Sequence, residues 1–307
     1  MTSASQALST GRVRFAVSAE TFRRVAFVAT GMLVLIVATG ATVRLTASGL
    51  GCEHWPGCQP GDPFPKKGYH SYIEFSNRIV AAFTVLATLI LALSATMTHS
   101  LTRPAKVLAW VVFVGTLGQA PLGAITVYFH LNPWLVLTHL LLSLAVLGIC
   151  VVVLIEATRT VRGSAEPLPS LARFGGALLL VSVSVLLVAG TIVTASGPHP
   201  GGQDVRRLSS FKPALDWHVR ATAVFGVVFL ALALWGWRNR ARFPWLPRAS
   251  AGLFGLLALQ MTIGEVQYRT RLPWWLVLIH VTVAACVFAW TVGLVARLWR
   301  PVAPGRA

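Results

Sequence analysis

Apolar stretches without charged side chains recur along the whole chain and are separated by short polar segments. A helix needs about 20 apolar residues to cross about 30 Å of hydrocarbon, and most of these stretches reach or approach that length. They lack the alternation of apolar and polar residues that is typical of a transmembrane barrel. We therefore expect an all-α, polytopic membrane protein. Its eight transmembrane helices are predicted at residues 25–43, 79–102, 107–129, 133–155, 174–198, 221–237, 249–264 and 272–296.

Composition and charge agree with this prediction. Of the 307 residues, 55% are hydrophobic and 11% are charged, whereas a soluble domain usually has about 25% charged residues. The net charge of +17 does not point to nucleic acid, because the basic residues stand at the ends of the apolar stretches. Most of them fall on the inner side if both termini are cytoplasmic. We expect a multi-pass protein of the plasma membrane that contacts lipid; a cleaved signal peptide is the alternative for the first stretch.

The chain repeats itself at an offset of 141 residues, without gaps, over part of its length. Gln119, Gly123 and His139 in one copy match Gln260, Gly264 and His280 in the other. Such self-similarity predicts two related units, here two pseudo-symmetric four-helix bundles, which run in the same direction because four helices return the chain to its starting side. The expected divisions are a tail at 1–24, a first half at 25–156, a linker at 157–172, a second half at 173–297 and a tail at 298–307.

Histidines on different helices of the second half are the strongest candidates for chemistry. His218 and His280 are expected at similar depth, near the outer ends of their helices, which suits the two axial positions of a haem iron. Zinc would need further Cys, His or carboxylate ligands, and none is grouped with them. A single membrane histidine can simply be a packing residue, but the paired depth and the equivalent His139 favour function. The same offset of 141 residues carries Asn77 onto His218.

Several other residues each allow two interpretations. Glu74, Asn77 and Arg78 share one helix face, and on spacing alone Glu74 pairs with Arg78. Arg78 and Arg220 stand beside the proposed ligand positions, where they would bind haem propionates or anchor the protein at the membrane surface. Gly123 and Gly264 would admit a flat macrocycle or serve close helix packing, and we weigh the two equally.

Two cysteines, Cys52 and Cys58, fall in the first outer loop. The environment outside the membrane permits a disulfide, which is a better interpretation than metal binding.

In combination these motifs resemble the haem A synthase family of membrane enzymes. The resemblance spans about residues 25–297 and is carried by the following elements: Thr46-Ala-Ser-Gly-Leu-Gly-Cys52 with Trp55, Pro56 and Cys58; Glu74, Asn77 and Arg78; Gln119, Gly123, Thr126, Val127 and His139; Gly190-Thr-Ile-Val-Thr-Ala-Ser-Gly-Pro-His199; His218; and Gln260, Gly264, Gln267, Tyr268 and His280. Each motif alone would be weak evidence.

The resemblance implies an activity, namely oxidation of a ring methyl group of haem O to the formyl group of haem A. It implies haem b held between His218 and His280, and haem O as the substrate of the first half beside His139. Glu74 matches the functionally important carboxylate of the family, and the Cys52–Cys58 pair matches a pair that can form a disulfide. Haem O synthase and the assembly factors of aa-type cytochrome oxidase would be partners.

The chain departs from the family pattern in two places. Relatives often have histidine where this chain has Asn77, which leaves the position opposite His139 open, weakly held, or served by His54 or His70. Relatives also often carry a second cysteine pair in the outer loop of the second half, and residues 199–215 contain no cysteine.

Two other classes of function compete with the enzyme. A bis-histidine membrane cytochrome b that only transfers electrons would use His218 and His280 in the same way. A transporter would also be built from repeated helical units, but its polar residues would mark a path through the middle of the membrane.

Overall fold

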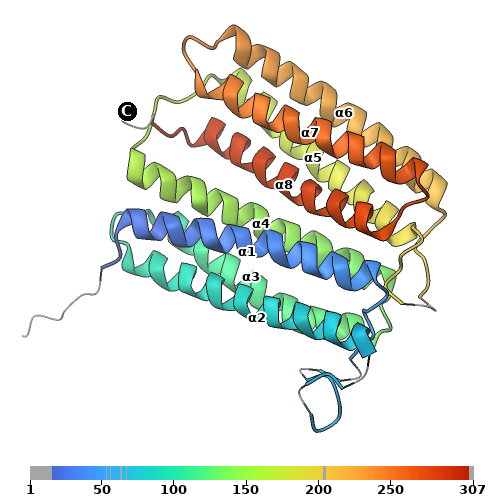
Figure 1. Cartoon of the computed structure of the whole chain (residues 1–307). Coiled ribbons are helices and arrows are strands. Elements are labelled where there is room, and N and C mark those ends of the chain that lie inside the picture. The colour runs from blue at the N-terminus through green and yellow to red at the C-terminus, as the bar shows by residue number, and fades with distance from the viewer. Residues whose placement is uncertain are drawn as a thin grey trace, which may run out of the picture.

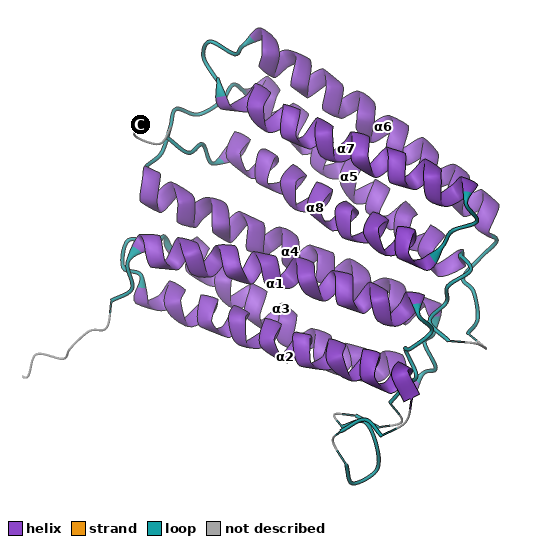
Figure 2. Cartoon of the chain, in the orientation of Figure 1, coloured by secondary structure: helices purple, strands orange, loops and turns teal. Residues whose placement is uncertain are grey.

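The computed structural model describes residues 16–303 apart from 53, 56, 63, 67 and 203–204. Its regular structure consists of helices, and the described residues include only isolated β-bridges and no strand (Figure 2). Each of the eight helices is long and apolar enough to span a membrane. The chain is therefore an all-α multi-pass membrane protein, as predicted. The helices are α1 (Ala19–Leu45), α2 (Gly68–Met97), α3 (Arg103–Tyr128), α4 (Pro133–Arg162), α5 (Ser170–Ser196), α6 (Phe211–Arg238), α7 (Trp245–Arg269) and α8 (Trp274–Trp299).

The helix ends differ from the apolar stretches that predicted them. α2 begins at Gly68 rather than near residue 79, and α6 begins at Phe211 rather than near residue 221. The predicted end of the second helix at residue 102 was wrong, because α2 ends at Met97 and Thr102 is the N-cap of α3. Charged residues bound the apolar stretch but not the helix, since a paired or surface-reaching charge can lie inside a helix that continues past the hydrocarbon.

The eight helices form two groups of four, α1–α4 and α5–α8, which lie on opposite sides of the molecule (Figure 1). In each group every helix contacts the next along the chain, and the fourth helix contacts the first, which closes a ring. The contact between α6 and α7 is the least extensive of these. The groups meet through α4 and α8, flanked by α1 against α8 and α4 against α5. Exchanging the two groups leaves this set of contacts unchanged, which is consistent with a pseudo-symmetric pair of bundles.

α1 begins and α8 ends at the same end of the bundle, which we call the terminal end (Figure 1). The opposite end carries the loop with Cys52 and Cys58, and we call it the disulfide end. At the terminal end, the buried carboxylate of Glu156 on α4 accepts a hydrogen bond of 2.7 Å from Arg300, which follows α8, and lies 3.7 Å from Arg159. This ion pair ties the two groups of helices together.

The turns between α3 and α4 and between α7 and α8 have the same unusual backbone. His130 and Leu131 have φ of 51° and 57°, and their repeat equivalents Arg271 and Leu272 have φ of 65° and 58°. Non-glycine residues rarely adopt this left-handed conformation, which costs about 1 kcal/mol or more at each position. The backbone N–H of Leu131 donates to Thr126 and that of Leu272 to Gln267, at 2.9 and 2.7 Å. The two tight turns set where α4 and α8 start, and hence the height of His139 and His280.

Candidate functional site

The imidazoles of the second group of helices each pack against a glycine on the neighbouring helix. A Cβ at Gly190 on α5 would lie 3.2 Å from Cε1 of His218 on α6. A Cβ at Gly264 on α7 would likewise lie 3.2 Å from Cε1 of His280 on α8. At either glycine an added Cβ would be closer to the ring than ordinary packing allows. The two rings therefore occupy the space that a side chain would otherwise fill. Each imidazole is therefore held by its edge against a helix backbone.

The two ring nitrogens of these histidines have different surroundings. Nδ1 of His218 and of His280 is buried and makes no hydrogen bond among the described residues. Nε2 of His280 lies 3.1 Å from the side-chain amide of Gln260. An amide that donates to Nε2 fixes the tautomer with its proton on Nδ1, which is the tautomer that an iron ligand needs.

His218 on α6 and His280 on α8 stand on two helices of the same group that are not neighbours in its ring of contacts. No group of three or more His, Cys, Asp or Glu side chains suited to a metal ion occurs in the part of the chain that the structure describes. Two imidazoles on facing helices, each with a buried Nδ1 and a glycine behind the ring, fit the axial ligands of a haem and do not fit a zinc centre.

The first group of helices repeats this plan with one exchange. A Cβ at Gly123 on α3 would lie 3.7 Å from Cε1 of His139 on α4, whose Nδ1 is buried and has no partner among the described residues. Asn77 stands where the second group has His218, and a Cβ at Gly40 would lie 4.0 Å from its side-chain oxygen. That oxygen accepts a hydrogen bond of 2.7 Å from Thr39. The first group thus offers one imidazole where the second offers two.

The glutamines beside these histidines take different partners in the two groups. Gln260 bonds to His280, whereas the side-chain oxygen of its equivalent Gln119 lies 3.2 Å from the hydroxyl of Ser143, which also donates to the backbone carbonyl of His139 at 2.9 Å. The residue that matches Ser143 under the offset of 141 is Ala284, which has no hydroxyl group. Gln119 therefore has a side-chain partner that its equivalent lacks, and no hydrogen bond between Gln119 and Nε2 of His139 occurs among the described residues.

Glu74 is buried near the disulfide end of α2, and both of its carboxylate oxygens are engaged. One accepts a hydrogen bond of 2.6 Å from Arg78, and the other accepts the backbone N–H of Cys52 at 2.9 Å. The pairing with Arg78 that the spacing favoured is present. The bond to Cys52 was not predicted, because no sequence pattern places this loop against α2. Glu74 thus joins the helix to the first loop.

The first loop is held to α2 by several further contacts. Cys52 and Cys58 form a disulfide, as predicted. Arg78 donates to the backbone carbonyls of His54 and Gly57, at 2.8 and 2.5 Å. Nearer to the start of α2, Nδ1 of His70 lies 2.9 Å from the hydroxyl of Ser48. Arg78 is therefore engaged with Glu74 and the loop in this structure, and its predicted role in binding propionates stays a prediction.

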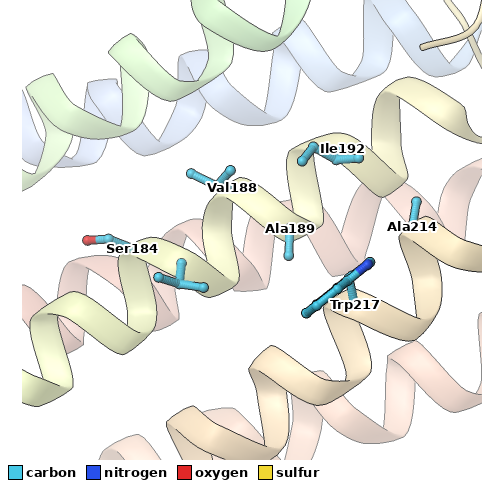
Figure 3. Close-up of a pocket in the computed structure, with 7 residues that line it drawn as sticks. Ser184, Val188, Ala189, Ile192, Ala214 and Trp217 are labelled. Atoms are coloured by element: carbon cyan, nitrogen blue, oxygen red, sulfur yellow. The ribbon is translucent and has the colours of Figure 1, made fainter. Parts of the chain in front are cut away.

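Arg220 is exposed on α6, where its guanidinium lies over the ring of Trp217 at 5.4 Å from the centroid. Trp217 also lines an apolar groove of about 410 Å³ between α5 and α6 (Figure 3). The groove is lined by Ser184, Val185, Val188, Ala189, Ile192, Ala214 and Trp217. Four of the seven side chains, those of Ser184, Val185, Val188 and Trp217, are exposed.

Sequence reasoning missed three features of these sites. Gly40 escaped notice and Gly190 was named only as part of a family motif, because the two are 150 residues apart and do not share the offset of 141. The difference between Ser143 and Ala284 could have been found by comparing the two copies residue by residue. Arg44 was not among the predicted site residues, and its partner, Thr194 in the other group of helices, cannot be inferred from sequence spacing.

The fold and these sites define a class: an all-helical, multi-pass membrane protein in which two groups of four helices present imidazoles at equivalent positions. A family model described as cytochrome oxidase assembly protein (COX15-CtaA) matches residues 23–292. The chain belongs to this family.

Curated relatives agree with this membership. Proteins named Heme A synthase from Geobacillus kaustophilus and Bacillus pumilus are 29% and 32% identical to the chain over 153 and 151 residues. A third, from Geobacillus thermodenitrificans, is 28% identical over 153 residues. The matches cover 50%, 48% and 50% of this chain and 45%, 49% and 45% of the relatives. The chain thus spans about half the length of the curated relatives it matches.

Proposed function

We propose that the chain is a haem A synthase that oxidises a ring methyl group of haem O to the formyl group of haem A. The observation that carries the proposal is the packing of three imidazoles, His139, His218 and His280, against glycines at equivalent places of two helical groups. Membership of the cytochrome oxidase assembly family and the name of the relatives support it. Side chains alone cannot oxidise a methyl group, and haem supplies the required oxidising power when bound.

His218 and His280 would be the axial ligands of a resident haem b in the second half. Gly190 and Gly264 would keep the two rings in place, and the bond of 3.1 Å between the Gln260 amide and Nε2 of His280 is one that iron would replace. A ligand that is already oriented loses less freedom on binding, which favours tight retention. In the first half, His139 alone would hold haem O, because Asn77 is a poor iron ligand and its oxygen already accepts from Thr39.

Glu74 is our candidate for the catalytic carboxylate. It lies about one helical turn from Asn77 toward the disulfide end, close to where haem O would be bound. A buried carboxylate can accept or donate a proton only if one of its two hydrogen bonds breaks. The bond from the Cys52 N–H is weaker than the bond from Arg78, because the backbone N–H carries no charge. The same contacts would let Glu74 act by positioning the loop, so the test must separate these two roles.

Substitutions at Glu74 separate proton chemistry from positioning. Glu74→Ala should abolish haem A formation and leave the second-half haem in place. Glu74→Gln keeps an oxygen for the Cys52 N–H but cannot accept a proton, so it should be equally inactive. The measurement is haem extraction from membranes of cells that make haem O but lack their own haem A synthase. A normal haem A yield from Glu74→Gln would reduce Glu74 to a positioning residue.

A bis-histidine cytochrome b that only transfers electrons is the second candidate, and the presence of two glycine-backed imidazoles, His218 and His280, in one group of helices favours it. The same extraction decides between the two functions. Expression of the wild-type chain should convert the haem O of these cells to haem A, and His139→Ala should restore haem O while the haem b spectrum remains. An unchanged haem O content on wild-type expression would favour the electron carrier.

We also propose a plasma-membrane location with both termini cytoplasmic, which places the disulfide end outside. Lys and Arg are more numerous in the described segments at the terminal end than in those at the disulfide end, as the positive-inside rule expects. Haem O synthase and assembly factors of aa-type cytochrome oxidase would then be partners, since they act before and after this reaction.

A further inference from the structure

Arg44 lies in the last turn of α1 and reaches from the first group of helices to the second. Its guanidinium donates a hydrogen bond to the backbone carbonyl of Thr194, near the end of α5. No carboxylate in the described part of the chain pairs with Arg44, and no second hydrogen bond of its side chain is found there. A guanidinium carries five N–H donors, so most of those of Arg44 remain available.

A small hollow adjoins Arg44 at the disulfide end. It is lined by Arg44, Leu131, Pro133, Val136, Ala195, Pro200, Val205 and Arg206. Arg206 also has no ion pair among the described residues, and no acidic side chain lines the hollow. Two guanidinium groups beside apolar walls, without a counter-charge, favour an anion. The hollow measures about 10 Å³, which is room for about one water-sized group.

The hollow adjoins the first-half site. Arg44 follows Gly40 by four residues on the same face of α1, and Gly40 is the residue that faces Asn77. Val136, which lines the hollow, precedes His139 by three residues on α4. Both steps amount to about one helical turn, or about 5–6 Å, toward the disulfide end. The hollow therefore lies about one turn above the two candidate ligand positions of the first half.

We propose that Arg44, assisted by Arg206, is the subsite that receives a carboxylate arm of the porphyrin substrate in the first half. This inference rests on the proposed function. The hollow has room for one water-sized group, so a single carboxylate oxygen can enter it and contact Arg44. Arg78 is engaged by Glu74 and by the carbonyls of the first loop, so Arg44 is the better placed of the two cations.

The test compares porphyrins with free and with blocked carboxylates. The full-length protein, carrying its second-half haem, is placed in phosphatidylcholine nanodiscs and titrated with haemin or with haemin dimethyl ester, and binding is followed by absorbance. The wild type should bind haemin about tenfold more tightly than the ester, because only haemin can form a charge-assisted bond. Arg44→Gln should bind both porphyrins alike, and Arg206→Gln should lose part of the preference.

Arg271→Gln is the matched control, since it removes the same charge at the same end but outside the hollow. It should keep the full preference for haemin. Arg44→Lys retains a positive charge and should keep part of the preference for haemin. An unchanged absorbance band of the second-half haem shows that the fold survives each change. If Arg44→Gln does not fold, Arg44→Lys and Arg206→Gln carry the test, and a wild-type preference in both would overturn the proposal.

Two further outcomes identify other causes. If discs that contain phosphatidylglycerol, or added inorganic phosphate, abolish the preference of the wild type, the hollow binds phosphate and the proposal is overturned. If the wild type binds no added porphyrin, the proposed function fails and this inference with it. Binding that is lost in His139→Ala but keeps its tenfold preference in Arg44→Gln would contradict this inference alone.

Discussion

At the scale of single residues, the glycines behind the imidazoles give the sharpest prediction. Gly264→Ala should lower the haem content of the second half severalfold, because the added methyl group would lie 3.2 Å from Cε1 of His280 and push the ring off its position. Gly123→Ala should change first-half binding little, since its methyl group would meet His139 at an ordinary 3.7 Å. The measurement is haem per protein after purification.

Gly255→Ala on the same helix is the control for Gly264→Ala. Nothing lies within 4 Å of a Cβ at Gly255, and alanine favours a helix over glycine by about 1 kcal/mol, so this variant should keep its haem and gain stability. Equal haem loss in Gly255→Ala and Gly264→Ala would show that the effect comes from the helix backbone and not from the contact with His280.

The hydroxyl of Ser143 makes a second prediction at this scale. Ser143→Ala should free Gln119 to bond to Nε2 of His139, as Gln260 bonds to His280. The new hydrogen bond, about 1 kcal/mol, would compete with iron and weaken binding of added haemin about fivefold. Ser184→Ala is the control, because that hydroxyl donates only to its own helix, at Leu180. Tighter or equal binding in Ser143→Ala would contradict the assigned role of Ser143.

At the scale of secondary-structure elements, the turns before α4 and α8 store backbone strain. Arg271 has a φ of 65° and is exposed, so Arg271→Gly should relieve a left-handed conformation without removing packing. The gain should be about 0.5–1 kcal/mol after the entropy cost of glycine. Arg269→Gly, at the last residue of α7, should bring no such gain, because its backbone is already helical and the ion pair with Glu265 is lost. Thermal unfolding in detergent measures both, and a loss of stability in Arg271→Gly would show that the turn is not strained.

The sequence predicted the number of helices but not where they end. Eight apolar stretches gave eight helices, because lipid offers no hydrogen-bond partners and a helix pairs all of its own backbone groups. The start of α2 at Gly68 was missed because the charged residues Glu74 and Arg78 interrupt the apolar stretch. They do not end the helix, since they pair with each other inside it. Charge placement locates the edge of the hydrocarbon, and hydrogen bonding locates the end of the helix.

The candidate site was predictable where the repeat preserved it. The offset of 141 residues matched His139 with His280 and Gly123 with Gly264, and the structure places each glycine against its histidine. Contacts that join segments without a shared pattern were not predictable. The bond from the Cys52 backbone to Glu74 and the bond from Arg44 to Thr194 depend on how loops and helix ends meet in space.

At the scale of the whole molecule, the ion pair between Glu156 and Arg300 links the two groups of helices at the terminal end. Glu156 is 2% exposed, and its oxygen lies 2.7 Å from Arg300 and 3.7 Å from Arg159. Glu156→Ala would leave a cavity and two arginines without their carboxylate, so it should destabilise the protein by about 2–3 kcal/mol. Arg300→Ala should cost less, because Arg159 would still face the carboxylate and Arg300 itself is partly exposed.

The position of this ion pair makes the prediction specific to the joint between the halves. If the pair holds α4 to the end of α8, Glu156→Ala should open that end while the proposed haem sites nearer the disulfide end remain intact. Hydrogen exchange should then rise in the terminal turns of α4 and α8, with haem content unchanged. Glu265→Ala is the control, because its partner Arg269 lies on the same exposed helix surface and joins nothing across the halves. Haem loss in Glu156→Ala that matches its loss of stability would show instead that the two halves unfold as one unit.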